Sequence, residues 1–139
     1  MVIWNAVVVL GVVLGLYELI AIHSDINFRG SHWLGHGVHS IVLMMVGLFA
    51  VFNWPLFLEI TTLGERGIPL ISDLWIGRAA IGLILNLKMH AVSKVVHGQL
   101  AARGMAEHWM HTLLISALVV VSPLYWPYIE PMLPAWLVF

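Results

Sequence analysis

Residues 39–58 read HSIVLMMVGLFAVFNWPLFL and contain no Asp, Glu, Lys or Arg. A helix that crosses the hydrocarbon core of a bilayer needs about 20 predominantly apolar residues. Lipid offers no hydrogen-bond partner to the backbone, so a segment that crosses it in this way must be helical. The stretch therefore predicts a membrane-spanning α-helix.

Three further segments, residues 2–22, 73–97 and 108–126, are long and apolar enough to be spans as well. The four spans predict an all-α fold, an integral membrane four-helix bundle that forms a single transmembrane domain over residues 1–139. Both termini then lie on the same side of the membrane. The first span lacks the charged start and the cleavage site of a signal peptide, so we expect it to be retained. Residues 127–139, which contain Pro, Trp and Tyr, are expected to form an interfacial tail.

The composition agrees with a membrane protein. Of 139 residues, 61% are hydrophobic and 9% are charged, the mean hydropathy is +0.97 and the net charge is -1. Soluble domains carry about 25% charged residues, so a soluble domain, a disordered tail and a nucleic-acid binder are excluded. The absence of Cys excludes disulfides, Cys-ligated zinc and iron–sulfur clusters. We expect a multi-pass protein of a bacterial-type inner membrane or its equivalent, with the lipid bilayer as its main partner.

Basic residues are unevenly divided between the two sides of this topology. The side of the first and third loops carries Arg29, Lys88, Lys94 and Arg103, and the other side carries Arg66 and Arg78. Because cytoplasmic loops carry an excess of Lys and Arg, the first and third loops are placed in the cytoplasm and the termini outside.

Several residues predict where the helices begin and end. Ser31 can cap the second helix, and Ser72 or Asp73 the third. Pro55 is expected to mark the end of the second helix and Gly104 the end of the third. Prolines are expected to break up the chain from the end of the fourth span through the tail, at Pro123, Pro127, Pro131 and Pro134.

Small residues predict close helix packing. Gly11 and Gly15 form a G-x-x-x-G pair in the first span, and Gly77 and Gly82 lie in the third. Such patterns let helix backbones approach one another, and packing within the bundle is favoured over dimerisation.

Histidine is unusually abundant: there are eight, against six Lys and Arg together. All eight fall at the predicted cytoplasmic ends of the spans, and the chain between His39 and His90 contains none. The predicted topology therefore gathers the imidazoles into one layer at one face of the membrane.

Helical spacing places these residues on shared faces. The groups are His32, His36 and His39; Asn86, His90 and His97; His108 and His111; and Glu18 with Asp25. Imidazole suits Zn, Cu, Fe and Ni, and carboxylates suit harder ions. The sequence thus predicts a transition-metal site, with iron favoured and copper or zinc as alternatives. The candidate ligands are His32, His36, His39, His90, His97, His108 and His111, with Glu18, His23, Asp25 and Asn86 as additional ligands or relay groups.

A site without metal is the competing interpretation, since a hydrogen-bonded histidine at a membrane interface needs no ion. Glu18 is stronger evidence for a functional site than the histidines are, because it lies about one turn inside the first span. Ionised and alone there, it would cost several kcal/mol, so it should be protonated, paired or bound to a cation.

Some of these groups resemble the histidine boxes of the membrane di-iron family that includes fatty-acid desaturases and hydroxylases. In that family, helical hairpins carry H-x(3–4)-H and H-x(2–3)-H-H boxes at their cytosolic ends. Residues 32–36 (HWLGH) match the first form. Residues 36–40 (HGVHS) and 108–112 (HWMHT) are similar to the second form, with Ser or Thr in place of the last His. His90 and His97 would stand in for an intermediate pair.

The resemblance covers residues 23–39 and 90–111, and the chain departs from the family in having no complete H-H doublet and no cytosolic cap. It implies a reduced relative that activates oxygen at iron and modifies a lipid-like substrate held by the apolar bundle.

Three other functions remain open from the residues alone, and so does the question of whether the protein is an enzyme. A b-type haem carrier would use His90 with His36 or His39 as axial ligands. A metal-ion or proton pathway would use Glu18 and histidines, but the outer halves of the spans are almost wholly apolar, which argues against it. A non-catalytic subunit, such as an assembly factor or a holin-like protein, would contact other membrane subunits.

Overall fold

The computed structural model describes the backbone of residues 1–23, 33–100 and 109–138, and the side chains of residues 1–20, 38–90 and 109–138. Four α-helices follow one another: α1 (Asn5–His23), α2 (Trp33–Ile60), α3 (Leu74–Leu100) and α4 (Trp109–Ile129). Two short 3-10 helices, η1 (Glu130–Met132) and η2 (Ala135–Leu137), come after α4. The described part of the chain contains no strand, so the predicted all-α fold class is confirmed.

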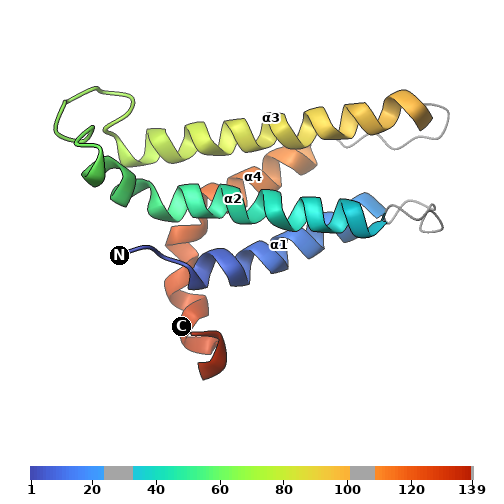
Figure 1. The fold of residues 1–139 in the computed structure, drawn as a ribbon, viewed down its shortest axis with the longest axis horizontal. Coiled ribbons are helices and arrows are strands. Elements are labelled where there is room, and N and C mark those ends of the chain that lie inside the picture. Colours follow the sequence, from blue (N-terminus) through green and yellow to red (C-terminus); the bar gives the residue numbers. More distant parts are fainter. Residues whose placement is uncertain (24–32, 101–108, 139) are drawn as a thin grey trace.

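The first three helices run side by side, and the fourth crosses them (Figure 1). α1 packs mainly on α2, while α3 contacts both α2 and α4. The contact between α1 and α4 is small, and it lies where the C-terminal part of α1 meets the first turn of α4. This crossing brings residues from the two ends of the chain together.

Two of the helices are long and apolar enough to cross a membrane. They are the stretches Val38–Ile60 of α2 and Trp109–Met132, which includes α4. Only 39% and 33% of their most apolar windows are buried, so most of these residues face outward rather than into a protein core. Asn5–Ile20 of α1 is a shorter apolar helix.

Asp73 begins α3, as the sequence predicted. Its Oδ1 accepts hydrogen bonds from the backbone N–H groups of Trp75 and Ile76, both at 2.8 Å. These are two of the amide groups that have no partner within the helix, so the carboxylate caps the helix. The predicted cap Ser31 and the predicted terminator Gly104 lie outside the described residues.

The prediction that α2 ends at Pro55 is wrong, because the helix continues to Ile60. Proline has no N–H, so inside a helix it leaves the carbonyl four residues earlier without its usual donor. That carbonyl belongs to Val51, and the Nε–H of Arg78 in α3 donates to it at 3.1 Å. A side chain from the neighbouring helix thus replaces the missing backbone hydrogen bond.

α4 also continues through two prolines that were expected to interrupt it, Pro123 and Pro127. The carbonyl that Pro123 leaves without a donor belongs to Val119, and the hydroxyl of Ser122 donates to it at 2.6 Å. The predicted tail 127–139 therefore begins later than expected. Pro131 lies in η1 and Pro134 precedes η2, where the helix has ended.

The glycines of α1 allow close contact with α2. A Cβ atom at Gly15 would lie 2.5 Å from the Cα of Ile41, and one at Gly11 would meet the Met45 side chain. No side chain fits between backbones at this separation, so the predicted role in packing within the chain is confirmed.

The glycines of α3 have the same role. Gly77 lies against the ring of Trp54 in α2, and Gly82 lies against Val120 in α4. α3 can therefore pack closely on both neighbours.

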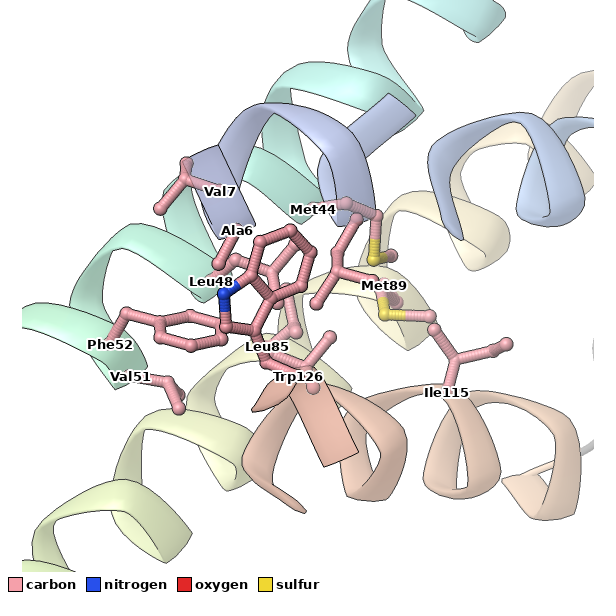
Figure 2. Close-up of a cluster of buried hydrophobic side chains, with 12 residues drawn as sticks. Ala6, Val7, Met44, Leu48, Val51, Phe52, Leu85, Met89, Ile115 and Trp126 are labelled. Atoms are coloured by element: carbon pink, nitrogen blue, oxygen red, sulfur yellow. The ribbon is translucent and has the colours of Figure 1, made fainter. Parts of the chain in front are cut away.

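Apolar side chains from all four helices form the core, shown in Figure 2. Its labelled members are Ala6, Val7, Met44, Leu48, Val51, Phe52, Leu85, Met89, Ile115 and Trp126. The Trp126 ring meets the edge of Phe52 with ring centroids 6.4 Å apart.

Asn53 joins α2 to the segment that precedes α1. Its Oδ1 accepts the backbone N–H of Ile3 at 2.8 Å, and its Nδ2 donates to the carbonyls of Phe49 at 3.0 Å and Ile3 at 3.4 Å. The buried amide thereby satisfies backbone groups at the start of the chain.

Candidate metal centre

A buried carboxylate–imidazole pair joins α1 to α4. The Oε2 of Glu18 lies 2.9 Å from the Nε2 of His111, although the two residues are 93 positions apart in the chain. The side chain of Glu18 is 4% exposed and that of His111 is 24% exposed. Of the states expected for Glu18 (protonated, paired or bound to a cation), the structure shows the paired one.

Both members of the pair lie near the ends of their helices. Glu18 precedes the end of α1 by about one turn, and His111 is in the first turn of α4. The ring of Tyr17 stacks on His111 with centroids 6.0 Å apart, and Tyr17 is half exposed. The pair is therefore covered by an aromatic side chain toward the surface and by the helices on its inner side.

The charge state of this pair decides its chemistry. Glu18 sits where an isolated carboxylate would be strongly disfavoured, and an N–H of His111 directed at Oε2 stabilises it. The same two groups, a carboxylate oxygen and an imidazole nitrogen, are ligands for iron, copper and zinc. The pair can thus hold either a proton or a metal ion.

His90 of α3 is a second polar side chain to consider as a ligand. Its ring is tilted against Trp109 of α4, with centroids 4.3 Å apart. Its Nδ1 is buried and has no hydrogen-bond partner among the described residues. A buried ring nitrogen without a partner is unfavourable in an apolar environment, and a water molecule, a ligand or a metal ion could satisfy it.

Asn86 lies one helical turn before His90 and is 1% exposed. Its Nδ2 donates to the hydroxyl of Ser116 in α4 at 3.3 Å, while its Oδ1 has no partner within the described chain. Asn86 thus forms a hydrogen bond between helices, and its Oδ1 leaves an acceptor on the same face of α3 as His90.

The structure thus brings some of the predicted residues together and leaves others apart. Glu18 contacts His111, Asn86 and His90 share a face of α3, and His39 is exposed on α2. The predicted site residues whose side chains lie outside the described part are His23, Asp25, His32, His36, His97 and His108. Among the described side chains, no three His, Asp or Glu residues are grouped closely enough to hold a metal ion.

Sequence reasoning missed two buried hydroxyl residues beside this site, Thr112 and Ser116. Thr112 is fully buried, and its hydroxyl donates to the carbonyl of Trp109 at 3.2 Å. Ser116 donates to the carbonyl of Thr112 at 2.9 Å and accepts from Asn86. The spacing of His108, Thr112 and Ser116 at i, i+4 and i+8 is the signal that could have placed them on one inward face.

No family model matches the chain, and no curated protein or solved structure matches it either.

Proposed function

We propose that the protein is a multi-pass membrane protein in which all four helices lie in the bilayer. Large apolar side chains that point outward on every helix support this arrangement, because water would disfavour them and lipid would not. Examples are Val13 and Ile20 on α1, Val42 and Val46 on α2, Leu83 and Ile84 on α3, and Leu113 and Leu114 on α4.

We further propose that the protein binds a transition metal at the cytoplasmic helix ends, with Glu18 and His111 as two of the ligands. The observation that carries this proposal is the 2.9 Å contact between a buried carboxylate and an imidazole. Both atoms are already close enough to enter one coordination sphere after a small rearrangement. Iron is the favoured metal, with copper or zinc as alternatives.

Further ligands are needed, since two do not complete a site. The described side chains do not supply a third ligand, because no three His, Asp or Glu residues among them, His90 included, are grouped closely enough to hold a metal ion. The predicted ligands His32, His36, His97 and His108 would complete the set. They are proposed because the sequence places them at the same predicted helix ends as Glu18 and His111.

In its most specific form, the proposed function is an oxygen-dependent oxidoreductase that acts on a lipid-like substrate. The metal would supply oxygen activation. The apolar faces of the helices would bind the substrate chain, and the partial histidine boxes support this reaction class by resemblance.

The test is elemental analysis and absorbance of protein purified in mild detergent without chelators. We expect close to one or two equivalents of iron, copper or zinc and no Soret band. Glu18→Gln and His111→Ala should each lower the metal content about ten-fold or more, as the loss of a ligand does. Glu59→Gln, which changes an exposed carboxylate at the other end of α2, is the matched control and should retain the metal.

A Soret band would replace this proposal with the haem carrier. Metal-free wild-type protein, or metal content unchanged in both variants, would overturn the metal centre and favour a non-catalytic membrane subunit.

A further inference from the structure

Arg78 is a cation in an unexpected place. It lies in the second turn of α3 and is only 7% exposed. Its Cζ lies 5.1 Å from the ring centroid of Trp75, and its Nε donates to the carbonyl of Val51. An arginine buried among apolar helices needs compensation for its charge.

No carboxylate contacts Arg78 in the described part of the chain, where its partners are the carbonyl of Val51 and the ring of Trp75. Asp73, the nearest acid in sequence, caps the start of α3 with its Oδ1. A carbonyl and an aromatic face stabilise a guanidinium, but neither carries a full negative charge. The positive charge therefore requires an anion that the described residues do not supply.

The guanidinium also has hydrogen-bonding capacity left. Arginine carries five N–H donors, and only Nε has a partner among the described residues. None of its nitrogens belongs to the fully buried atoms without a partner, so its unpartnered tip reaches the molecular surface. Most of the side chain is covered, and only its tip has some contact with the surface.

The surface around this fork is apolar and aromatic. Trp75 and Ile76 of α3 are exposed, as is Phe57 of α2. Exposed Trp beside Arg at a helix start is typical of the boundary between hydrocarbon and headgroups. The abundant anion at that depth is the phosphate of a phospholipid, whose geometry matches the arginine fork.

We propose that Arg78 binds the phosphate of a membrane phospholipid at the α2–α3 surface, on the non-cytoplasmic side. This site rests on the membrane arrangement proposed above but not on the metal centre, because Arg78 and its contacts share no residue with the Glu18–His111 pair. The lipid would supply the missing negative charge.

A simple substitution of Arg78 would mix two effects, since Arg78 also satisfies the carbonyl that Pro55 leaves without a donor. Pro55→Ala restores a backbone N–H for the Val51 carbonyl and makes α2 independent of Arg78. The informative comparison is thus Pro55→Ala against Pro55→Ala/Arg78→Gln. Arg66→Gln, which removes the exposed arginine of the α2–α3 connection, is the matched charge control.

The experiment is native mass spectrometry of the full chain titrated with phosphatidylglycerol, phosphatidylcholine, chain-matched diacylglycerol or inorganic phosphate. We expect both phospholipids to bind to wild type, Pro55→Ala and Arg66→Gln, and diacylglycerol to bind about ten-fold more weakly. Pro55→Ala/Arg78→Gln should lose about ten-fold in phospholipid affinity, which corresponds to the loss of charge-assisted hydrogen bonds. Circular dichroism should show an unchanged helix content in this double variant.

Phospholipid binding that is unchanged in Pro55→Ala/Arg78→Gln would overturn the proposal. Binding of diacylglycerol equal to that of phospholipid would overturn it as well, and competition by inorganic phosphate at equal concentration would reassign the site to free phosphate. Measurements on both variants distinguish the lipid site from the metal centre. Arg78→Gln should leave the metal content unchanged, and His111→Ala should leave phospholipid binding unchanged.

Discussion

Glu18 and His111 form the contact that joins the first helix to the last, with 2.9 Å between Oε2 and Nε2. α1 and α4 otherwise touch little. This polar contact should therefore contribute to the association of the two helices, beside the apolar core that both of them enter, and in addition to any role in binding metal.

The stability of this pair can be measured in chelator-treated protein. His111→Leu leaves the Glu18 carboxylate buried without its imidazole, and we expect the free energy of unfolding to fall by about 2–3 kcal/mol. The value is below that of a fully buried pair because His111 is 24% exposed. Glu18→Leu/His111→Leu should recover part of this loss, since the buried carboxylate that lost the imidazole is removed as well. Denaturant titration in detergent, followed by circular dichroism, measures both; additive losses would show that the two side chains do not interact.

Gly15 is expected to tolerate no side chain. Gly15→Ala places a Cβ 2.5 Å from the Cα of Ile41, so the two helix backbones must separate. Alanine is the better helix former by about 1 kcal/mol, yet the net effect should be a loss of about 1–3 kcal/mol from overpacking. Gly64→Ala is the control, because the nearest atom to its Cβ is 3.9 Å away. A Gly15→Ala protein as stable as wild type would contradict the close packing of α1 on α2.

Ser122 should matter because of the proline that follows it. Ser122→Ala leaves the Val119 carbonyl without a donor, and we expect a loss of about 1 kcal/mol. In Pro123→Ala, the backbone N–H of residue 123 can donate to Val119, so the same serine substitution should cost little. Thermal unfolding measures the cost of Ser122→Ala in the wild-type protein and in Pro123→Ala. The difference between the two costs is the contribution of the serine hydroxyl as a replacement donor to the Val119 carbonyl. Equal losses in both would mean that the serine acts by packing alone.

Asn53 should secure the segment before α1. Asn53→Leu removes its hydrogen bonds to Ile3 and should lower stability by about 1–2 kcal/mol. Faster hydrogen exchange at the first residues of the chain should accompany this loss. Asn5→Leu is a matched control, because the buried Oδ1 of Asn5 has no partner within the described residues, and its replacement should be neutral or stabilising. Exchange that stays slow in Asn53→Leu would indicate that the ring contact of Trp4 with Phe49 is sufficient.

Local rules predicted much of the fold. The apolar runs predicted four helices, Asp73 predicted the start of α3, and Gly11 and Gly15 predicted a close helix contact. Each of these features depends on residues within a few positions or on the size of one side chain. Spacing also placed Asn86 and His90 on one helix face, which the structure retains.

The proline positions show where local rules fail. By itself Pro55 ends a helix, because a carbonyl loses its donor. The helix continues because Arg78, in another helix, supplies a replacement. The partner lies 27 residues from the carbonyl of Val51, so no local pattern could indicate it.

The sequence by itself determined the apolar, all-helical character of this protein, and it predicts that the histidines gather at one face of the membrane. Only the tertiary structure decided that Glu18 pairs with His111 and that Arg78 supports α2. The physical reason is that helix formation and hydrophobicity are properties of short segments, whereas the partner of a buried polar group depends on which helices pack together and on how α4 crosses the others.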